Sequence, residues 1–130
     1  QPDIDIDTMT QTSGMVFSQQ ADLSTTLRWL GIASAQVPQL DMAASGGIHE
    51  PQDVVKAILA GATAVEICSA IYLQGESFID QCTEFLTEWL KSKGIPTIAE
   101  AKGRLNQKNV SDNSTFERAQ FMRYYSSHEQ

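Results

Sequence analysis

Residues 43–51 read AASGGIHEP, in which two adjacent glycines, Gly46 and Gly47, separate a short apolar run from a proline. The apolar run predicts a buried strand over 39–45. The proline suits the first position of a helix, and the apolar residues beyond it extend that helix over 51–60. The stretch is therefore interpreted as a strand, a glycine turn and a helix, and it raises the question of what requires bare backbone between the two elements.

The same alternation continues on both sides of this stretch. A helix is expected over 20–34, a second strand over 63–68, and an amphipathic helix between Gly75 and Gly94. Strands separated by helices pair in parallel through crossover connections. Two strands do not make a stable parallel sheet, and a closed (β/α)8 barrel would use about four times as many. We therefore expect an α/β fold that is the C-terminal portion of a (β/α)8 TIM barrel, namely its last two strand-helix units plus tail helices.

This expectation divides the chain into three parts. Residues 1–17 are predicted to be a loop following barrel strand 6, with a short strand at "MVFS". Residues 18–94 are expected to form helix 6, strand 7, helix 7, strand 8 and helix 8. Residues 95–130 are predicted to form a helical tail, because the Ser/Thr-x-x-Glu patterns that start at Thr97 and Ser114 are typical of helix N-termini.

Charge and cysteine content restrict the functions that are open to the chain. The formal net charge is −7, and the first ninety residues hold only Arg28 and Lys56 as basic residues, so nucleic-acid binding through the main body is not expected. Cys68 and Cys82 are too few and too far apart for a metal cluster, so no metal is expected. No apolar run reaches the ~20 residues of a membrane span, and the acidic N-terminus is unlike a signal peptide, so a cytoplasmic location is expected.

The glycine turn is a candidate phosphate-binding site. In a (β/α)8 barrel the active site lies at the C-terminal ends of the strands, and the loops after strands seven and eight commonly hold a phosphate. Gly46 and Gly47 follow the first predicted strand, and the small residues 68–70 follow the second. Lys56 is the only lysine or arginine between positions 43 and 75, so a bound phosphate would rely mainly on main-chain amides. The spacing is equally compatible with a tight turn and a crowded barrel rim that bind nothing.

The segment "LRWLGIASAQVPQLDMAASGGIHEPQDVVKAILAGATAVEICSAIYLQG", followed by "LTEWLKSKG", resembles the C-terminal part of class 1A dihydroorotate dehydrogenases. It is more similar still to the dihydroorotate dehydrogenase-like proteins, whose ends carry a segment similar to "AKGRLNQKNVSDNSTFERAQFMRYYSS". The resemblance covers nearly all of the chain and is most specific over 27–75 and 103–125.

This resemblance implies an enzyme with flavin mononucleotide (FMN) on a (β/α)8 barrel, a homodimer that oxidises dihydroorotate or a related dihydropyrimidine in pyrimidine biosynthesis. It implies that two segments bind the flavin phosphate, and these contain Ser45, Gly46, Gly47, Cys68, Ser69 and Ala70. The catalytic base, the flavin-contacting lysine and the substrate-binding asparagines of the family lie on earlier strands. No residue of this chain is therefore nominated as catalytic, and the segment alone is expected to be inactive.

Two other interpretations stay open at the level of sequence. The chain could be the C-terminal part of a different phosphate-binding barrel enzyme, such as a sugar-phosphate lyase or isomerase. It could also be a non-enzymatic α/β module whose glycine turn is only structural. A bound flavin absorbs blue light and would separate the first interpretation from both alternatives.

Overall fold

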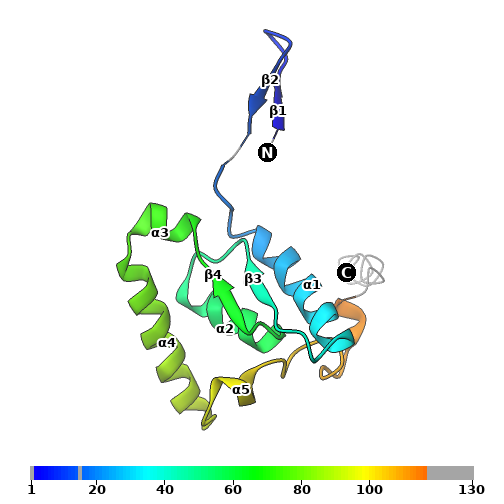
Figure 1. Ribbon diagram of the computed structural model, residues 1–130, viewed down its shortest axis with the longest axis vertical. Helices are drawn as coiled ribbons and strands as arrows, with labels where there is room; N and C mark the ends of the chain where they lie inside the picture. The colour runs from blue at the N-terminus through cyan, green and yellow to red at the C-terminus, as the bar shows by residue number, and fades with distance from the viewer. Residues whose placement is uncertain (1, 15, 117–130) are drawn as a thin grey trace, which may run out of the picture.

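The computed structural model describes residues 2–14 and 16–116 (Figure 1). Two short strands come first, and a body of helices and two further strands follows. The elements in chain order are β1 Pro2–Asp5, β2 Thr10–Ser13, α1 Asp22–Gln36, β3 Ala43–Ser45, α2 Pro51–Ala60, β4 Ala64–Glu66, α3 Ser69–Gln74, α4 Ser77–Lys93, α5 Ile98–Ala101 and the 3-10 helix η1 Asn113–Thr115.

The centre of the body is a parallel pair of strands, β3 and β4, joined through α2. Ala43 lies opposite Ala64, and Ser45 lies opposite Glu66. The predicted strand-helix-strand order and the parallel pairing are thus confirmed, although both strands are shorter than the sequence predicts. The described residues form no closed barrel, because the sheet has two strands here.

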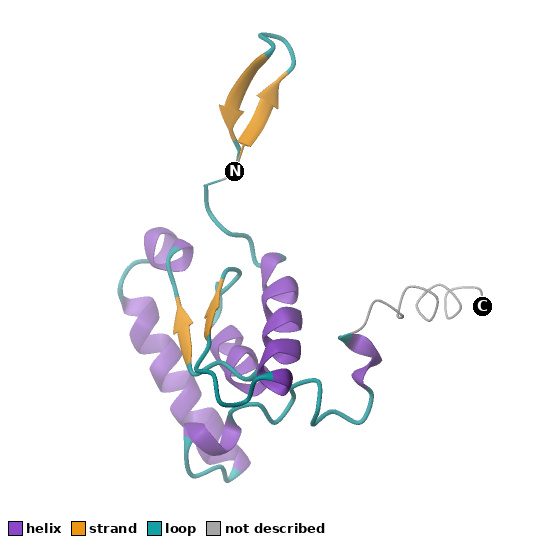
Figure 2. Cartoon of the chain, turned by 45° about the vertical axis from the view of Figure 1, so that its right-hand side comes forward, coloured by secondary structure: helices purple, strands orange, loops and turns teal. Residues whose placement is uncertain are grey.

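Helices cover one face of this sheet. Figure 2 shows α1, α2 and α4 gathered around the two strands, and α2 packs against both α1 and α4. Ala44 points into this layer and is only 1% exposed, while its neighbours Ala43 and Ser45 are exposed on the other face. The core lies between the sheet and the helices and contains Leu23, Leu30, Ala44, Ile48, Val54, Ala57, Ile58, Ala60, Ala62, Ala70, Phe78, Cys82, Ile95 and Ala101.

Helix α2 begins and ends as the sequence predicts. Pro51 occupies its first turn, where the missing N–H costs no hydrogen bond. Asp53 is fully buried, and its Oδ2 accepts the main-chain N–H groups of His49 (3.2 Å) and Glu50 (3.0 Å). The Asp53 carboxylate therefore satisfies amides at the start of the helix and fixes the chain that leaves the glycine turn.

The N-terminal residues differ from the prediction, because they form a hairpin instead of a loop. β1 and β2 pair antiparallel, with Pro2 opposite Ser13, and no strand forms over 16–18. At the turn, Asp5 Oδ1 accepts the N–H groups of Asp7 and Thr8, and the Thr8 bond is the larger cause of a lowered pKa for the Asp5 carboxyl. The strands are almost wholly exposed, so no buried apolar face marks them in the sequence.

The helices after β4 confirm one expectation and add one element. The predicted amphipathic helix is α4, which ends at Gly94 in the left-handed conformation. The short helix α3, over Ser69–Gln74, stands where the sequence predicts only a turn toward Gly75.

The tail crosses back over the outer side of the body. Thr97 Oγ1 accepts the N–H of Glu100, which confirms the predicted helix start at Thr97. Residues 103–107, here called the C-terminal strap, donate main-chain hydrogen bonds to α2 and α1: Gly103 N to Ile58 O, Leu105 N to Leu59 O and Gln107 N to Gly31 O. The second predicted tail helix, from Ser114, coincides at its start with η1, and its remainder lies outside the described residues.

Candidate functional site

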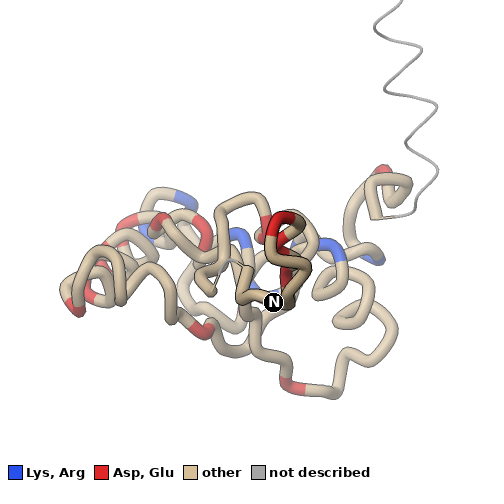
Figure 3. Tube along the Cα trace, turned by 90° about the horizontal axis from the view of Figure 1, so that it is seen from above, with Lys and Arg blue, Asp and Glu red and all other residues tan. Residues whose placement is uncertain are grey.

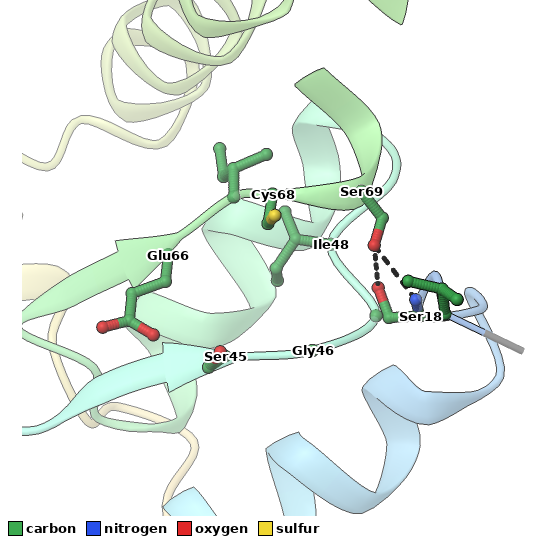
Figure 4. A pocket seen from close by; sticks show the side chains of 10 residues that line it. Ser18, Ser45, Gly46, Ile48, Glu66, Cys68 and Ser69 are labelled. Carbon is green, nitrogen blue, oxygen red and sulfur yellow. Dashed lines mark hydrogen bonds between the residues drawn. The ribbon is translucent and has the colours of Figure 1, made fainter. Parts of the chain in front are cut away.

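A pocket of about 290 Å³ opens at the C-terminal ends of β3 and β4. Five of the six predicted site residues line it, contributed by the end of β3 and by the segments after the two strands (Figure 4). Ala70 is the exception: it is fully buried and belongs to the core beneath the pocket. The lining consists of Val16, Ser18, Ser45, Gly46, Gly47, Ile48, Glu66, Ile67, Cys68 and Ser69.

The backbone of the glycine turn is oriented by a threonine of α1. Thr26 Oγ1 donates to the carbonyl oxygens of Ser45 (2.9 Å) and Gly46 (3.1 Å). A trans peptide places its C=O and N–H on opposite sides. The N–H groups of Gly46 and Gly47 therefore point away from Thr26.

The two glycines differ in what surrounds them. Both have positive φ, +94° at Gly46 and +82° at Gly47, a conformation that favours glycine. A Cβ at Gly47 would lie 2.1 Å from the main-chain N of Leu23, whereas a Cβ at Gly46 would meet only Thr26 Oγ1 at 3.5 Å. The packing of α1 against the turn therefore requires glycine at position 47, whereas it does not require glycine at position 46.

Ser69, the first residue of α3, faces a loop that precedes α1. Its Oγ accepts both the main-chain N–H of Ser18 (3.0 Å) and the Ser18 hydroxyl (3.1 Å), as Figure 4 shows. His49 Nε2 lies 2.8 Å from the Ser18 carbonyl oxygen. Because a carbonyl can only accept, Nε2 of His49 carries a proton and donates it there. His49 does not line the pocket, so it serves as the anchor of Ser18.

Among the residues that the structure describes, no lysine or arginine lines the pocket. Lys56, the nearest lysine or arginine to the glycine turn in sequence, is paired with Asp53 at 2.8 Å. Figure 3 shows acidic residues over much of the trace and basic residues scattered singly between them. Glu66 brings a carboxylate to the pocket, at the end opposite Ser69 in Figure 4. Hydrogen-bond donors of neutral groups therefore stand at one end and an acidic acceptor at the other.

Two polar lining residues, Ser18 and Glu66, were not predicted from the sequence. Ser18 lies in a segment without periodicity, so only the three-dimensional structure brings it to Ser69. Glu66 follows the half-buried Val65 in β4, and the alternation of side chains along a strand could have placed it beside Ser45 on the open face.

The two cysteines have opposite environments. Cys68 is exposed at the pocket, whereas Cys82 is buried in the core. Burial raises the pKa of the Cys82 thiol, and the carboxylate of Asp53 raises it further. Within residues 2–14 and 16–116, no group of three or more potential ligand side chains is placed to hold a metal ion, and no helix is long and apolar enough to cross a bilayer.

Several known proteins similar to this chain are dihydroorotate dehydrogenases. Dihydroorotate dehydrogenase A (fumarate) of Lactococcus lactis subsp. cremoris is 32% identical over 68 residues, which are 52% of this chain and 22% of that protein. The catalytic subunit of dihydroorotate dehydrogenase B (NAD(+)) of Pyrococcus abyssi is 40% identical over 58 residues, 45% of this chain and 19% of that protein. The crystal structure of ligand-free type DHODH from Eimeria tenella superposes with a TM-score of 0.62 at 26% identity, over 66% of this chain and 24% of that one.

The chain resembles dihydroorotate dehydrogenases in both sequence and structure. The resemblance inferred from the sequence is thereby confirmed over about half of the chain, and it extends to B-type as well as A-type dihydroorotate dehydrogenases. No family model matches the chain. The chain spans about a fifth of the length of the curated dihydroorotate dehydrogenases that it matches.

Proposed function

We propose that this chain provides the FMN phosphate-binding part of an oxidoreductase of the dihydroorotate dehydrogenase type. The observation that carries the proposal is the pocket at the ends of β3 and β4, where segments predicted to bind the flavin phosphate come together. The similarity to dihydroorotate dehydrogenases supports the same assignment. The reaction would be the oxidation of dihydroorotate, or of a related dihydropyrimidine, within pyrimidine biosynthesis.

The pocket fits the phosphate and the polyol chain of FMN. The N–H groups of Gly46 and Gly47 and the hydroxyl of Ser69 are donors, which match the acceptor oxygens of a phosphate. Glu66 and Ser45, on the open face of the strands, supply oxygens that can accept from hydroxyl groups of the ribityl chain. When bound, FMN would accept the hydride of the substrate.

The roles of this chain would be binding and orientation. Main-chain donors cost no reorganisation when the phosphate binds, because Thr26 and the packing of Gly47 already fix the turn. None of the lining residues is assigned as the base that removes a substrate proton. In this proposal that base belongs to other strands of a (β/α)8 barrel, whose last two strands would be β3 and β4.

The open face of the sheet supports the barrel part of the proposal. Ala43, Ser45, Ala64 and Glu66 are exposed on that face, and in a barrel it would be turned toward the interior. A homodimer and a cytoplasmic location, both expected from the sequence, stay predictions.

Titration with two flavins tests the proposed function. FMN and riboflavin differ by the phosphate, so a phosphate site predicts that the chain binds FMN at least about tenfold more tightly than riboflavin, as measured by flavin fluorescence. Lys56→Ala serves as a control and should leave both affinities unchanged, because Lys56 is paired with Asp53 and does not line the pocket. Equal affinity for the two flavins would contradict the proposal.

Two other outcomes would assign the chain to a different class. Binding of a sugar phosphate without binding of FMN would favour a lyase or isomerase of another barrel family. Failure to bind any phosphorylated ligand would favour a non-enzymatic module with a purely structural glycine turn.

A further inference from the structure

We propose that Thr26 and Ser18 are positioning residues that aim the hydrogen-bond donors of the pocket at the phosphate. This inference rests on the proposed function and goes beyond the residues that would touch the ligand. Neither residue belongs to the segments predicted to bind FMN: Thr26 lies on α1, and Ser18 lies in the loop that precedes α1.

Thr26 acts on the main chain. Its hydroxyl reaches two successive carbonyl oxygens, those of Ser45 and Gly46, at 2.9 and 3.1 Å. Those two peptides carry the N–H groups of Gly46 and Gly47. Glycine has no Cβ to restrict rotation of the peptide planes, so an isolated Gly-Gly turn samples many orientations. The hydroxyl selects one in which both N–H groups point away from Thr26, and both glycines line the pocket.

Ser18 acts on the Ser69 hydroxyl. A serine hydroxyl has two acceptor lone pairs and one proton. Ser18 donates to Ser69 Oγ twice, from its main-chain N–H and from its own hydroxyl. Both lone pairs of Ser69 are then occupied, and only its proton is left for the ligand. His49 keeps Ser18 in place by donating to the Ser18 carbonyl oxygen.

Together the two contacts fix the direction of the donors at this end of the pocket and leave Ser69 as a donor only. Such a site favours an oxygen that carries charge and no proton, as in a phosphate monoester, over a neutral hydroxyl. The preference would come from hydrogen-bond direction rather than from a basic side chain, since no lysine or arginine lines the pocket among the described residues.

The test measures the dissociation constants of FMN and riboflavin for the full chain and for four variants. Thr26→Val keeps the shape of the side chain and removes the hydroxyl, while Thr26→Ser restores it. Ser18→Ala removes one of the two donors to Ser69, while Ser18→Thr keeps it. Circular dichroism establishes that each variant folds, and Thr26→Ala replaces the valine variant if the latter does not.

We expect Thr26→Val to weaken FMN binding about tenfold and Ser18→Ala about threefold, with riboflavin binding changed less than about twofold. The serine and threonine variants should bind FMN as the unmodified chain does. An unchanged ratio of FMN to riboflavin affinity in both the valine and the alanine variants would overturn the positioning role alone. Equal affinity of the unmodified chain for the two flavins would overturn the proposed function and this inference together.

Discussion

Gly46 and Gly47 are neighbours in sequence with different reasons for being glycine. Leu23 of α1 lies where a side chain at Gly47 would be, whereas the space beside Gly46 holds only the Thr26 hydroxyl at van der Waals distance. The sequence predicts that both residues allow close approach of a ligand. In the structure Gly47 also has a packing role, because helix α1 lies against it. Since α1 is separate from the turn in sequence, the residues of the turn alone could not predict this role.

Substitution of the two glycines should separate these roles. Gly47→Ala forces the main chain of Leu23 aside and also strains a positive φ, so we expect it to lower the free energy of unfolding by about 3 kcal/mol or more. Gly46→Ala strains φ alone and should cost about 1–2 kcal/mol. Urea unfolding followed by circular dichroism gives both values. Equal losses of unfolding free energy in the two variants would show that the main chain of Leu23 moves aside at little cost and that Gly47 has no special packing role.

The two cysteines offer a residue-scale probe of the pocket. The thiolate is the form of cysteine that reacts with iodoacetamide. Cys82 is buried and its thiol has a raised pKa, whereas Cys68 is exposed, so iodoacetamide near pH 8 should modify Cys68 first. Because Cys68 lines the pocket, FMN at ten times its dissociation constant should slow that reaction about tenfold.

Mass spectrometry of the alkylated peptides provides the measurement, and riboflavin at the same fractional occupancy serves as the comparison. Preferential labelling of Cys82 would contradict the burial seen in the structure. Labelling of Cys68 at the same rate with and without FMN would place the flavin elsewhere.

At the scale of elements, the strand-turn-helix unit could be predicted because its signals are local. Pro51 and the apolar residues of 51–60 define α2, and the glycines define the end of β3. Hairpin β1–β2 and helix α3 could not be predicted in the same way. The hairpin strands bury no face, and α3 has six residues, too few to display a helical period.

The candidate site was predictable to the same extent. Residues directly after the two strands could be assigned to one edge of the sheet, because parallel strands end together. Ser18 and Thr26 could not, since each reaches the pocket through contacts that only the packing of α1 and its preceding loop creates.

The start of α2 is expected to depend on one buried carboxylate. Asp53→Ala removes the acceptor for the N–H groups of His49 and Glu50 and the partner of Lys56. We expect a loss of about 2–4 kcal/mol in unfolding free energy, measured by thermal or urea unfolding. Gln52→Ala, on the exposed side of the same turn, is the control and should change stability by less than about 0.5 kcal/mol. A similar loss in both variants would mean that the helix start does not depend on Asp53.

At the scale of the whole molecule, the body has one covered and one open side. The uncovered face of β3 and β4 is accompanied elsewhere on the surface by exposed apolar side chains, including Trp29, Tyr72 and Leu73. Such surfaces are unusual for a monomer and favour association.

We therefore expect the chain, studied alone, to associate in a concentration-dependent manner. Sedimentation velocity over a hundredfold dilution series should show the average mass falling as the concentration falls. A Tyr72→Ser, Leu73→Ser double variant should shift the association to higher concentration if α3 contributes to the contact. A compact monomer at every concentration would contradict this prediction.

The C-terminal strap joins parts of the chain that are far apart in sequence. Gly103 and Leu105 bond to the end of α2, and Gln107 bonds to α1. The strands and helices can assemble through nearer contacts, but the strap must close long loops before its hydrogen bonds repay that entropy. It should accordingly be the last part to dock during folding and the first to open. Its amide protons would then exchange with deuterated solvent sooner than those inside α2, so local opening would begin at the strap and leave the pocket at the ends of β3 and β4 intact.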